Sequence, residues 1–150
     1  MALLSDKYEH DFYGWIMHNS NLIRQGRLSE IDIENIAEEL ETMGRSEKRQ
    51  LINRLAVLIS HLLKWKFQPG LRGHNWKYTI EEQRISILEL LEDSPSLKHE
   101  IESKFDNAYE HAIRRTIQDT GLDKNNFPKE CPFTFSQCLD KGFFPGEEIV

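Results

Sequence analysis

Apolar residues recur at helical spacing along most of the chain, and the strongest pattern lies between Asp32 and Pro69. They follow one another mainly at steps of three and four, which is the spacing of one face of an α-helix. Stepping through Glu47 carries the pattern past Gly44 in phase. We therefore predict one long helix, with two helices hinged at Gly44 as the alternative, because an interior glycine costs about 1 kcal/mol relative to alanine. The apolar positions are Ile33, Ile36, Ala37, Leu40, Met43, Leu51, Leu55, Leu58 and Leu62.

The segment before this pattern also reads as an amphipathic helix. Ser5 or Asp6 can cap its start, and Gly26 is placed to end it in the left-handed conformation. A short turn then leads to the long helix, for which Ser29 or Asp32 can serve as the N-cap. Apolar positions on the first helix are Tyr8, Phe12, Trp15, Ile16, Leu22 and Ile23.

Two more helices follow the stop at Pro69-Gly70. We predict the first of them from a cap at Asn75 to Glu92-Asp93, with Trp76, Ile80, Ile87, Leu88 and Leu91 inward and Glu81, Glu82 and Arg84 on its flanks. The second begins at Ser94-Pro95, where proline suits the first helical position, and runs to about Thr120, just before Gly121. Its inward residues are Leu97, Ile101, Phe105, Ala108, Tyr109, Ala112 and Ile117.

The C-terminal segment contains a short helix over 135–139 that Thr134 can cap. Its aromatic residues indicate that it packs on the helices, since disordered tails are poor in aromatics. No segment alternates apolar and polar residues strictly, and no hairpin dipeptide occurs. We predict an all-α fold, an elongated up-and-down helical bundle of four main helices plus a short C-terminal helix, as a single domain over 1–150. The aromatic residues of the segment are Phe127, Phe133, Phe135, Phe143 and Phe144.

Charge is segregated along the chain, although the net charge is only −6. Residues 28–44 carry six acids and no base, whereas residues 45–84 carry nine bases and three acids. The acidic total argues against general nucleic-acid binding, but the basic tract allows a local version of it.

Several functional classes find no support in the sequence. The apolar run at the N-terminus is too short for a signal peptide, and no stretch is apolar enough to span a membrane, so we expect a cytoplasmic protein with no membrane association. Cys131 and Cys138 lack the spacing of a zinc or redox motif and are expected to be buried thiols. No motif of phosphate, dinucleotide or hydrolase chemistry occurs, so we predict no cofactor and favour a non-enzymatic role.

A candidate functional cluster lies where the long helix ends and the next one begins. Arg54, Val57, His61, Lys64 or Trp65, and Gln68 form a second stripe beside the leucines. Polar groups placed there must find hydrogen bonds, so the structural interpretation has His61 bonded to a backbone carbonyl or to a carboxylate such as Glu82, with Lys64 and Arg54 solvated. The functional one makes His61 a base or a phosphate-contacting group, beside a wall of Trp65, His74, Trp76 and Tyr78.

Metal binding has a weaker basis. No Glu-x-x-His or His-x-x-x-His pair occurs, and the six histidines are never three or four residues apart. Glu34, Glu38 and Glu41 share a helix face and could hold a divalent ion together with His61, but acidic solvent-facing surfaces are commoner. We predict no metal site.

Six strings of the sequence follow one another in a characteristic order: DFYGW, EIDIENIAEELETMGRSEKRQL, LISHLLKWKFQP, NWKYTIEEQR, DSPSL and FPKECPFTFSQCLDKGFFP. In these strings the chain resembles a bacterial family catalogued as domain of unknown function 29. The resemblance implies a helical fold and transfers no activity. The characteristic tract of the family maps onto Glu38, Glu39, His61, Leu62, Leu63, Lys64, Trp65, Gln68, Pro69, Trp76, Gln83 and Arg84.

Three functions remain open at this point. The first is a small non-enzymatic helical protein that binds a protein partner or forms a homo-oligomer, since its acidic and basic surfaces are self-complementary. The second is a nucleic-acid-associated protein that uses Arg45, Lys48, Arg49, Arg54, Lys64, Lys66, Arg72 and Lys77. The third is an enzyme or metal protein centred on Glu38, His61 and Arg84. The candidate functional cluster consists of Glu38, Glu39, His61, Lys64, Trp65, Gln68, Trp76 and Arg84.

Overall fold

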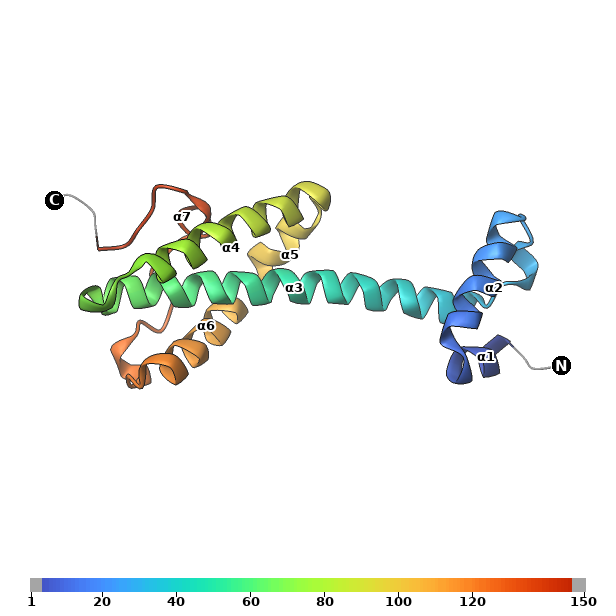
Figure 1. Cartoon of the computed structure of the whole chain (residues 1–150), viewed down its shortest axis with the longest axis horizontal. Coiled ribbons are helices and arrows are strands. Elements are labelled where there is room, and N and C mark those ends of the chain that lie inside the picture. The colour runs from blue at the N-terminus through green and yellow to red at the C-terminus, as the bar shows by residue number, and fades with distance from the viewer. Residues whose placement is uncertain (1–3, 147–150) are drawn as a thin grey trace. The chain divides into compact units, whose positions relative to one another are not determined.

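The computed structural model describes residues 4–146, with side chains from residue 7 onward, and in that range the chain forms helices and turns without any strand (Figure 1). The all-α prediction is confirmed. The α-helices are α1 (Leu4–His10), α2 (Phe12–Arg24), α3 (Ile33–Phe67), α4 (His74–Asp93), α5 (Leu97–Ser103), α6 (Phe105–Thr120) and α7 (Phe135–Leu139). Short 3₁₀ helices are η1 (Leu28–Glu30), η2 (Pro69–Leu71) and η3 (Lys124–Asn126).

The chain divides into two compact units, Met1–Ser46 and Glu47–Val150, which we describe separately as the first and second unit. Every residue of α3 from Ile33 to Phe67 is helical, Gly44 included, which confirms one long helix without a break. The single domain over 1–150 and the up-and-down order of four main helices stay predictions.

In the first unit, Asp11 breaks the predicted N-terminal helix into α1 and α2. Its carboxylate accepts the backbone N–H of Gly14 at 3.0 Å and so caps α2. A Cβ at position 14 would lie 2.3 Å from Asp11 Oδ2, so the Asp11 carboxylate would have to move if a larger residue replaced Gly14. The predicted caps at Ser5 and Asp6 are wrong, since α1 begins at Leu4. Gly26 ends this part of the chain at φ 73°, as predicted.

A small core holds α2 to the start of α3. Trp15 and Asn19 are buried, and both bond to Asp32, the residue just before α3. Trp15 Nε1 donates to Asp32 Oδ2 at 2.9 Å, and Asn19 Oδ1 accepts the backbone N–H of Asp32 at 2.9 Å. Of the two predicted N-caps, Ser29 instead lies within η1.

The second unit contains the main core. The predicted leucines of α3, from Leu51 to Leu62, are at most 1% exposed. Figure 1 shows α4 and α6 alongside this part of α3, and two side-chain contacts, Arg54–Gln83 and Ser60–Thr116, tie α3 to these helices. Residues that pack with the leucines include Ile80, Ile87, Ile101, Ala108 and Ala112.

Three details of α4 differ from the sequence prediction. The helix begins at His74 after Gly73, so Asn75 lies inside its first turn and is not the N-cap. Leu88 was expected inside but is 41% exposed. Arg84 was expected on the flank but is buried, because two backbone carbonyls of the C-terminal segment accept its guanidinium protons.

The predicted last long helix is also two helices. Residues 94–96 form a turn, so α5 starts at Leu97 and not at Pro95. At Lys104 the backbone N–H bonds to both Glu100 and Ile101, which ends α5 before α6 begins. Gly121 follows α6 at φ 73°, where the prediction placed the end of the helix.

The C-terminal segment packs on the second unit, as its aromatic content predicts. Phe127 and Phe133 are buried, and Phe143 and Phe144 lie against the core. Thr134 caps α7 in a capping box with Gln137, which confirms the predicted short helix. Within residues 4–146, no helix has the length and apolarity that a membrane crossing requires.

Candidate functional site

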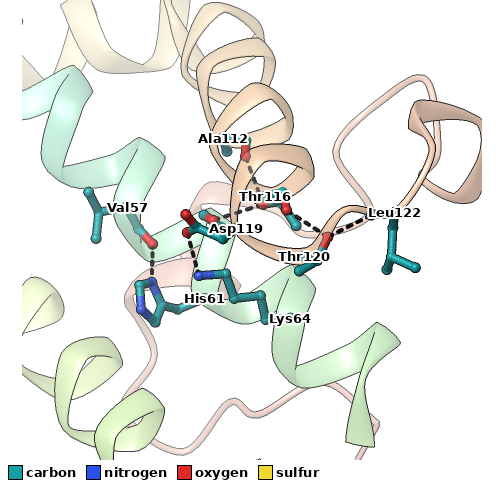
Figure 2. A network of polar contacts seen from close by, with 9 residues as sticks. Val57, His61, Lys64, Ala112, Thr116, Asp119, Thr120 and Leu122 are labelled. Carbon is teal, nitrogen blue, oxygen red and sulfur yellow. Dashed lines mark hydrogen bonds and ion pairs between the residues drawn. The ribbon is translucent and has the colours of Figure 1, made fainter. Parts of the chain in front are cut away.

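A polar network joins α3 to α6 inside the second unit (Figure 2). Lys64 Nζ donates to Asp119 Oδ2 at 2.7 Å. Ser60 Oγ lies 2.8 Å from Thr116 Oγ1, and both residues are fully buried. Because Thr116 gives its only hydroxyl proton to the carbonyl of Ala112 at 2.7 Å, Ser60 must be the donor to Thr116. Every hydroxyl in this pair therefore has a partner.

His61 lies beside this network, one turn before Lys64. Its Nδ1 lies 2.9 Å from the carbonyl oxygen of Val57. A carbonyl only accepts, so Nδ1 carries the proton and Nε2 holds the lone pair of the neutral ring. Burial lowers the pKa of His61, helped by the charges of Lys64 and Arg115 and opposed by the Val57 bond and Asp119. The ring is therefore neutral at pH 7, and its bond to Val57 matches the structural interpretation.

Trp65 and Arg72 contact the C-terminal segment at the end of α3. Arg72 Nε donates to the carbonyl of Trp65 at 2.7 Å, and Nη2 donates to the carbonyl of Pro145 at 3.3 Å. The Trp65 ring packs on the Phe144 ring, with 5.1 Å between centroids. Arg72 thus fastens residues near 145 to the last turn of α3.

Arg84 fastens the same segment from α4. Its Nε donates to the carbonyl of Cys138, and its Nη2 donates to that of Phe143, both at 2.7 Å. The guanidinium also lies over the Phe144 ring, 5.3 Å from its centroid. Burial lowers the pKa of Arg84. Arg84 Nη1 and Trp65 Nε1 are buried without a hydrogen-bond partner in the part of the chain that the structure describes. Arg84 therefore holds the C-terminal segment against α4.

The rest of the predicted cluster lies elsewhere. Glu38 and Glu39 belong to the first unit, where Glu38 pairs with Arg45 at 3.2 Å and Glu39 accepts the hydroxyl proton of Tyr8. That hydrogen bond raises the pKa of Tyr8 to about 12. In the second unit, Trp76 packs on the core and Gln68 is half-buried. The structure therefore brings His61 and Lys64 together beside α6, and Trp65 and Arg84 together on Phe144.

Most cations predicted to contact nucleic acid have partners within the chain. Lys48 pairs with Glu100 at 2.7 Å, which lowers the pKa of that carboxyl. Lys66 and Lys77 lie over aromatic rings, and Arg54 donates to Gln83 at 3.4 Å. The remaining four are Arg45, Lys64 and Arg72, which are bonded as described above, and the exposed Arg49.

The described residues provide neither a cluster of metal ligands nor a reactive thiol. Within 4–146, no three His, Cys, Asp or Glu side chains converge to hold an ion. Cys131 and Cys138 are free, half-buried and buried respectively. Burial raises the pKa of Cys131 to about 11 and raises the pKa of Cys138 as well. Both sulfurs therefore stay protonated near neutral pH and are poor nucleophiles.

Two surface grooves of the second unit were not predicted. The α6 groove has a volume of about 830 Å³, and the α4–α7 groove about 920 Å³. The α6 groove is lined by Tyr109, Glu110, Ile113, Arg114, Ile117, Lys124, Asn125, Phe127, Pro128 and Lys129. The α4–α7 groove is lined by Leu88, Leu91, Glu92, Lys98, Glu102, Thr134, Phe135, Ser136, Leu139 and Asp140.

Comparison with known proteins places this architecture in a family. The sequence profile described as "Domain of unknown function DUF29" matches residues 7–144, which is nearly the whole chain. The chain belongs to the DUF29 family. No curated protein and no solved structure matches it. The resemblance seen in the sequence is confirmed, and the family description assigns no activity to the DUF29 chain.

The DUF29 chain also exposes an apolar surface in its first unit, which we call the first-unit face. It consists of Ile33, Leu40 and Met43 on α3, whose side chains are 63–64% exposed. Exposed Ala37 lies between them at the same helical spacing. The sequence predicted this stripe as part of a buried face, and the structure leaves it uncovered within the first unit.

One signal in the sequence could have located the α6 groove. Ile113 and Ile117 lie one turn apart on α6, beside Arg114, so they mark an apolar strip next to a cation. The other wall comes from the segment 124–129 after Gly121. Spacing along one helix does not reveal where such a loop returns.

Proposed function

We propose that this DUF29 chain is a protein-binding module that associates with a second copy of itself through the first-unit face. The observation that carries the proposal is the exposure of Ile33, Leu40 and Met43. The same stripe of α3 continues into Leu51 and Leu55, which the second unit buries completely. Covering such a contiguous apolar stripe releases water from it, which is the main driving force of protein association.

Charge favours a second copy as the partner. Acids flank the first-unit face at Glu34, Glu38 and Glu41, and only Arg45 is paired with them. A partner surface should therefore be apolar and basic. The second unit of another copy offers apolar surface and exposed cations of this kind. A second copy supplies both halves of the contact.

The two other functions have less support. Nucleic-acid binding through 45–84 needs free cations, and most of those cations pair with acids, carbonyls or rings of the chain itself. A catalytic centre at His61 and Arg84 needs access to a substrate, whereas Arg84 is 1% exposed and His61 is bonded to Val57. We propose a cytoplasmic location, which suits the two free thiols.

Sedimentation velocity over a range of protein concentrations tests the proposal. The wild-type chain should sediment faster as its concentration rises, and Leu40→Glu should abolish this increase by placing a charge in the contact. The helix should persist in the variant, because glutamate is a good helix former. Circular dichroism at equal concentrations checks that α3 stays folded.

Ile85→Glu is the matched control. Ile85 is also an exposed aliphatic residue on a helix, at 52% exposure, but it belongs to α4 and lies outside the first-unit face. This variant should associate like the wild type. A wild-type chain that stays monomeric at every concentration would refute the proposal, as would equal losses in Leu40→Glu and Ile85→Glu.

A further inference from the structure

We infer that the α6 groove is the surface that receives the first-unit face of a second copy. This inference rests on the proposed function and adds the location of the other half of the contact. Each surface lies within one unit, the face in Met1–Ser46 and the groove in Glu47–Val150. The contact can therefore be argued from the local geometry of each surface.

The α6 groove has the composition that the face requires. Its floor is apolar, since Ile113 and Phe127 are 6–7% exposed and Ile117 is half-buried beside them. Tyr109 closes the floor and donates its hydroxyl proton to the carbonyl of Pro128 at 2.6 Å, which holds the 124–129 wall against α6. The volume of 830 Å³ is within the range of about 300–1,000 Å³ that lets a pocket bury a small ligand. Neighbouring side chains such as Leu40 and Met43 can enter it together.

Charge distinguishes this groove from the α4–α7 groove. The rim of the α6 groove has three cations and one acid, whereas that of the α4–α7 groove has Glu92, Glu102 and Asp140 against Lys98. Both floors are apolar, so the hydrophobic effect alone does not choose between them. The acids beside the face repel the second rim and attract the first.

The cations of the α6 groove are available for such a contact. Within the described part of the chain, Arg114, Lys124 and Lys129 form no ion pair with a carboxylate. Arg114 contacts only the exposed ring of His111, at 3.4 Å. In the basic tract 45–84, in contrast, most cations have partners among the described residues, and Arg49 is the exception among the eight that were predicted to contact nucleic acid. The basic surface that complements the acids beside the first-unit face therefore lies on α6 and the loop 124–129 after it.

Face and groove are different surfaces, so the contact is heterologous, and charge reversal can test it. The face variant is Glu34→Lys with Glu41→Lys, and the groove variant is Lys124→Glu with Lys129→Glu. All four residues are exposed, so folding should persist. Each variant alone should associate at least about tenfold more weakly than the wild type, because like charges then meet across the contact.

An equimolar mixture of the two variants is the decisive sample. The reversed face then meets the reversed groove, and the wild-type face meets the wild-type groove, so attraction returns at both. The mixture should regain association close to that of the wild type in sedimentation velocity. The restored association should weaken with salt, since salt screens exposed charges. Rescue in the mixture also shows that both variants are folded.

Lys98→Glu with Lys141→Glu is the control for the groove variant. It makes the same change in net charge outside the α6 groove and should leave association unchanged. If the groove variant associates like the wild type while Leu40→Glu is monomeric, the groove assignment is wrong and the proposed function stands. Failure of the mixture to regain association also overturns the assignment. A wild-type chain that never associates would contradict both the groove assignment and the proposed function.

Discussion

Lys64 and Asp119 form an ion pair that ties α3 to α6, with 2.7 Å between Nζ and Oδ2. The two ends of the pair differ in exposure, since the Lys64 side chain is 8% exposed and that of Asp119 is 43% exposed. Among residues 7–146, Asp119 is the only carboxylate that pairs with Lys64, whereas water can also solvate the aspartate. A buried ammonium group without a partner anion lowers the stability of the folded state, whereas removing the ammonium group itself does not.

This asymmetry predicts opposite consequences for two substitutions. Asp119→Ala leaves the buried charge unpaired and should lower the free energy of unfolding by about 2 kcal/mol. Lys64→Met keeps the apolar stem and removes the charge, so it should cost less than about 1 kcal/mol. Urea unfolding of both variants measures the difference. A larger loss in Lys64→Met than in Asp119→Ala would contradict this explanation.

Arg84→Met should destabilise the second unit by about 3 kcal/mol, because the carbonyls of Cys138 and Phe143 lose charged donors. The backbone amides of residues 138–144 should then exchange hydrogen faster than in the wild type. Arg49→Met is the control, since Arg49 is exposed, and it should stay within about 0.5 kcal/mol of the wild type. Equal protection of residues 138–144 from hydrogen exchange in the two variants would show that Arg84 does not hold the C-terminal segment in place.

His61 should make the protein acid-sensitive, because burial lowers its pKa in the folded state. Below its unfolded pKa, which is about 6.5, the unfolded state binds more protons than the folded state, so the stability due to neutral His61 is lost as the pH falls. His61→Gln keeps a polar side chain without this titration. The difference in unfolding free energy between wild type and variant should therefore shift against the wild type from pH 7 to pH 5. A pH-independent difference would show that the ring does not titrate differently on folding.

Thr134→Ala should lower the free energy of unfolding by about 1 kcal/mol, because it removes the side-chain oxygen that accepts the N–H of Gln137 in the capping box. Ser136→Ala, at an exposed position inside α7, is the control and should be nearly neutral. Thermal unfolding of the two variants compares them. Equal midpoints would mean that the capping box does not contribute to stability.

Much of the candidate cluster was recognisable from its residue types, but its roles were not. Polar groups beside the leucines predict hydrogen bonds, and His61 does bond to a backbone carbonyl, whereas Lys64, expected to be solvated, is buried and paired with Asp119. The partner of Arg84 was not predictable, because its carbonyl acceptors lie 54 and 59 residues further along the chain. Glu38 and His61 share a helix in the sequence pattern, yet each has its own neighbours in its own unit.

The sequence by itself determined the helical class, the unbroken α3, the leucine core of the second unit, the ends at Gly26 and Gly121 and the cap at Thr134. These features depend on the period of the helix and on local backbone chemistry, which neighbouring residues decide. Only the tertiary structure decided that Leu55 is covered whereas Leu40 is exposed, and that Arg84 is buried whereas Arg114 is exposed. Helical periodicity identifies an apolar face, and what covers it depends on segments that are distant in the chain.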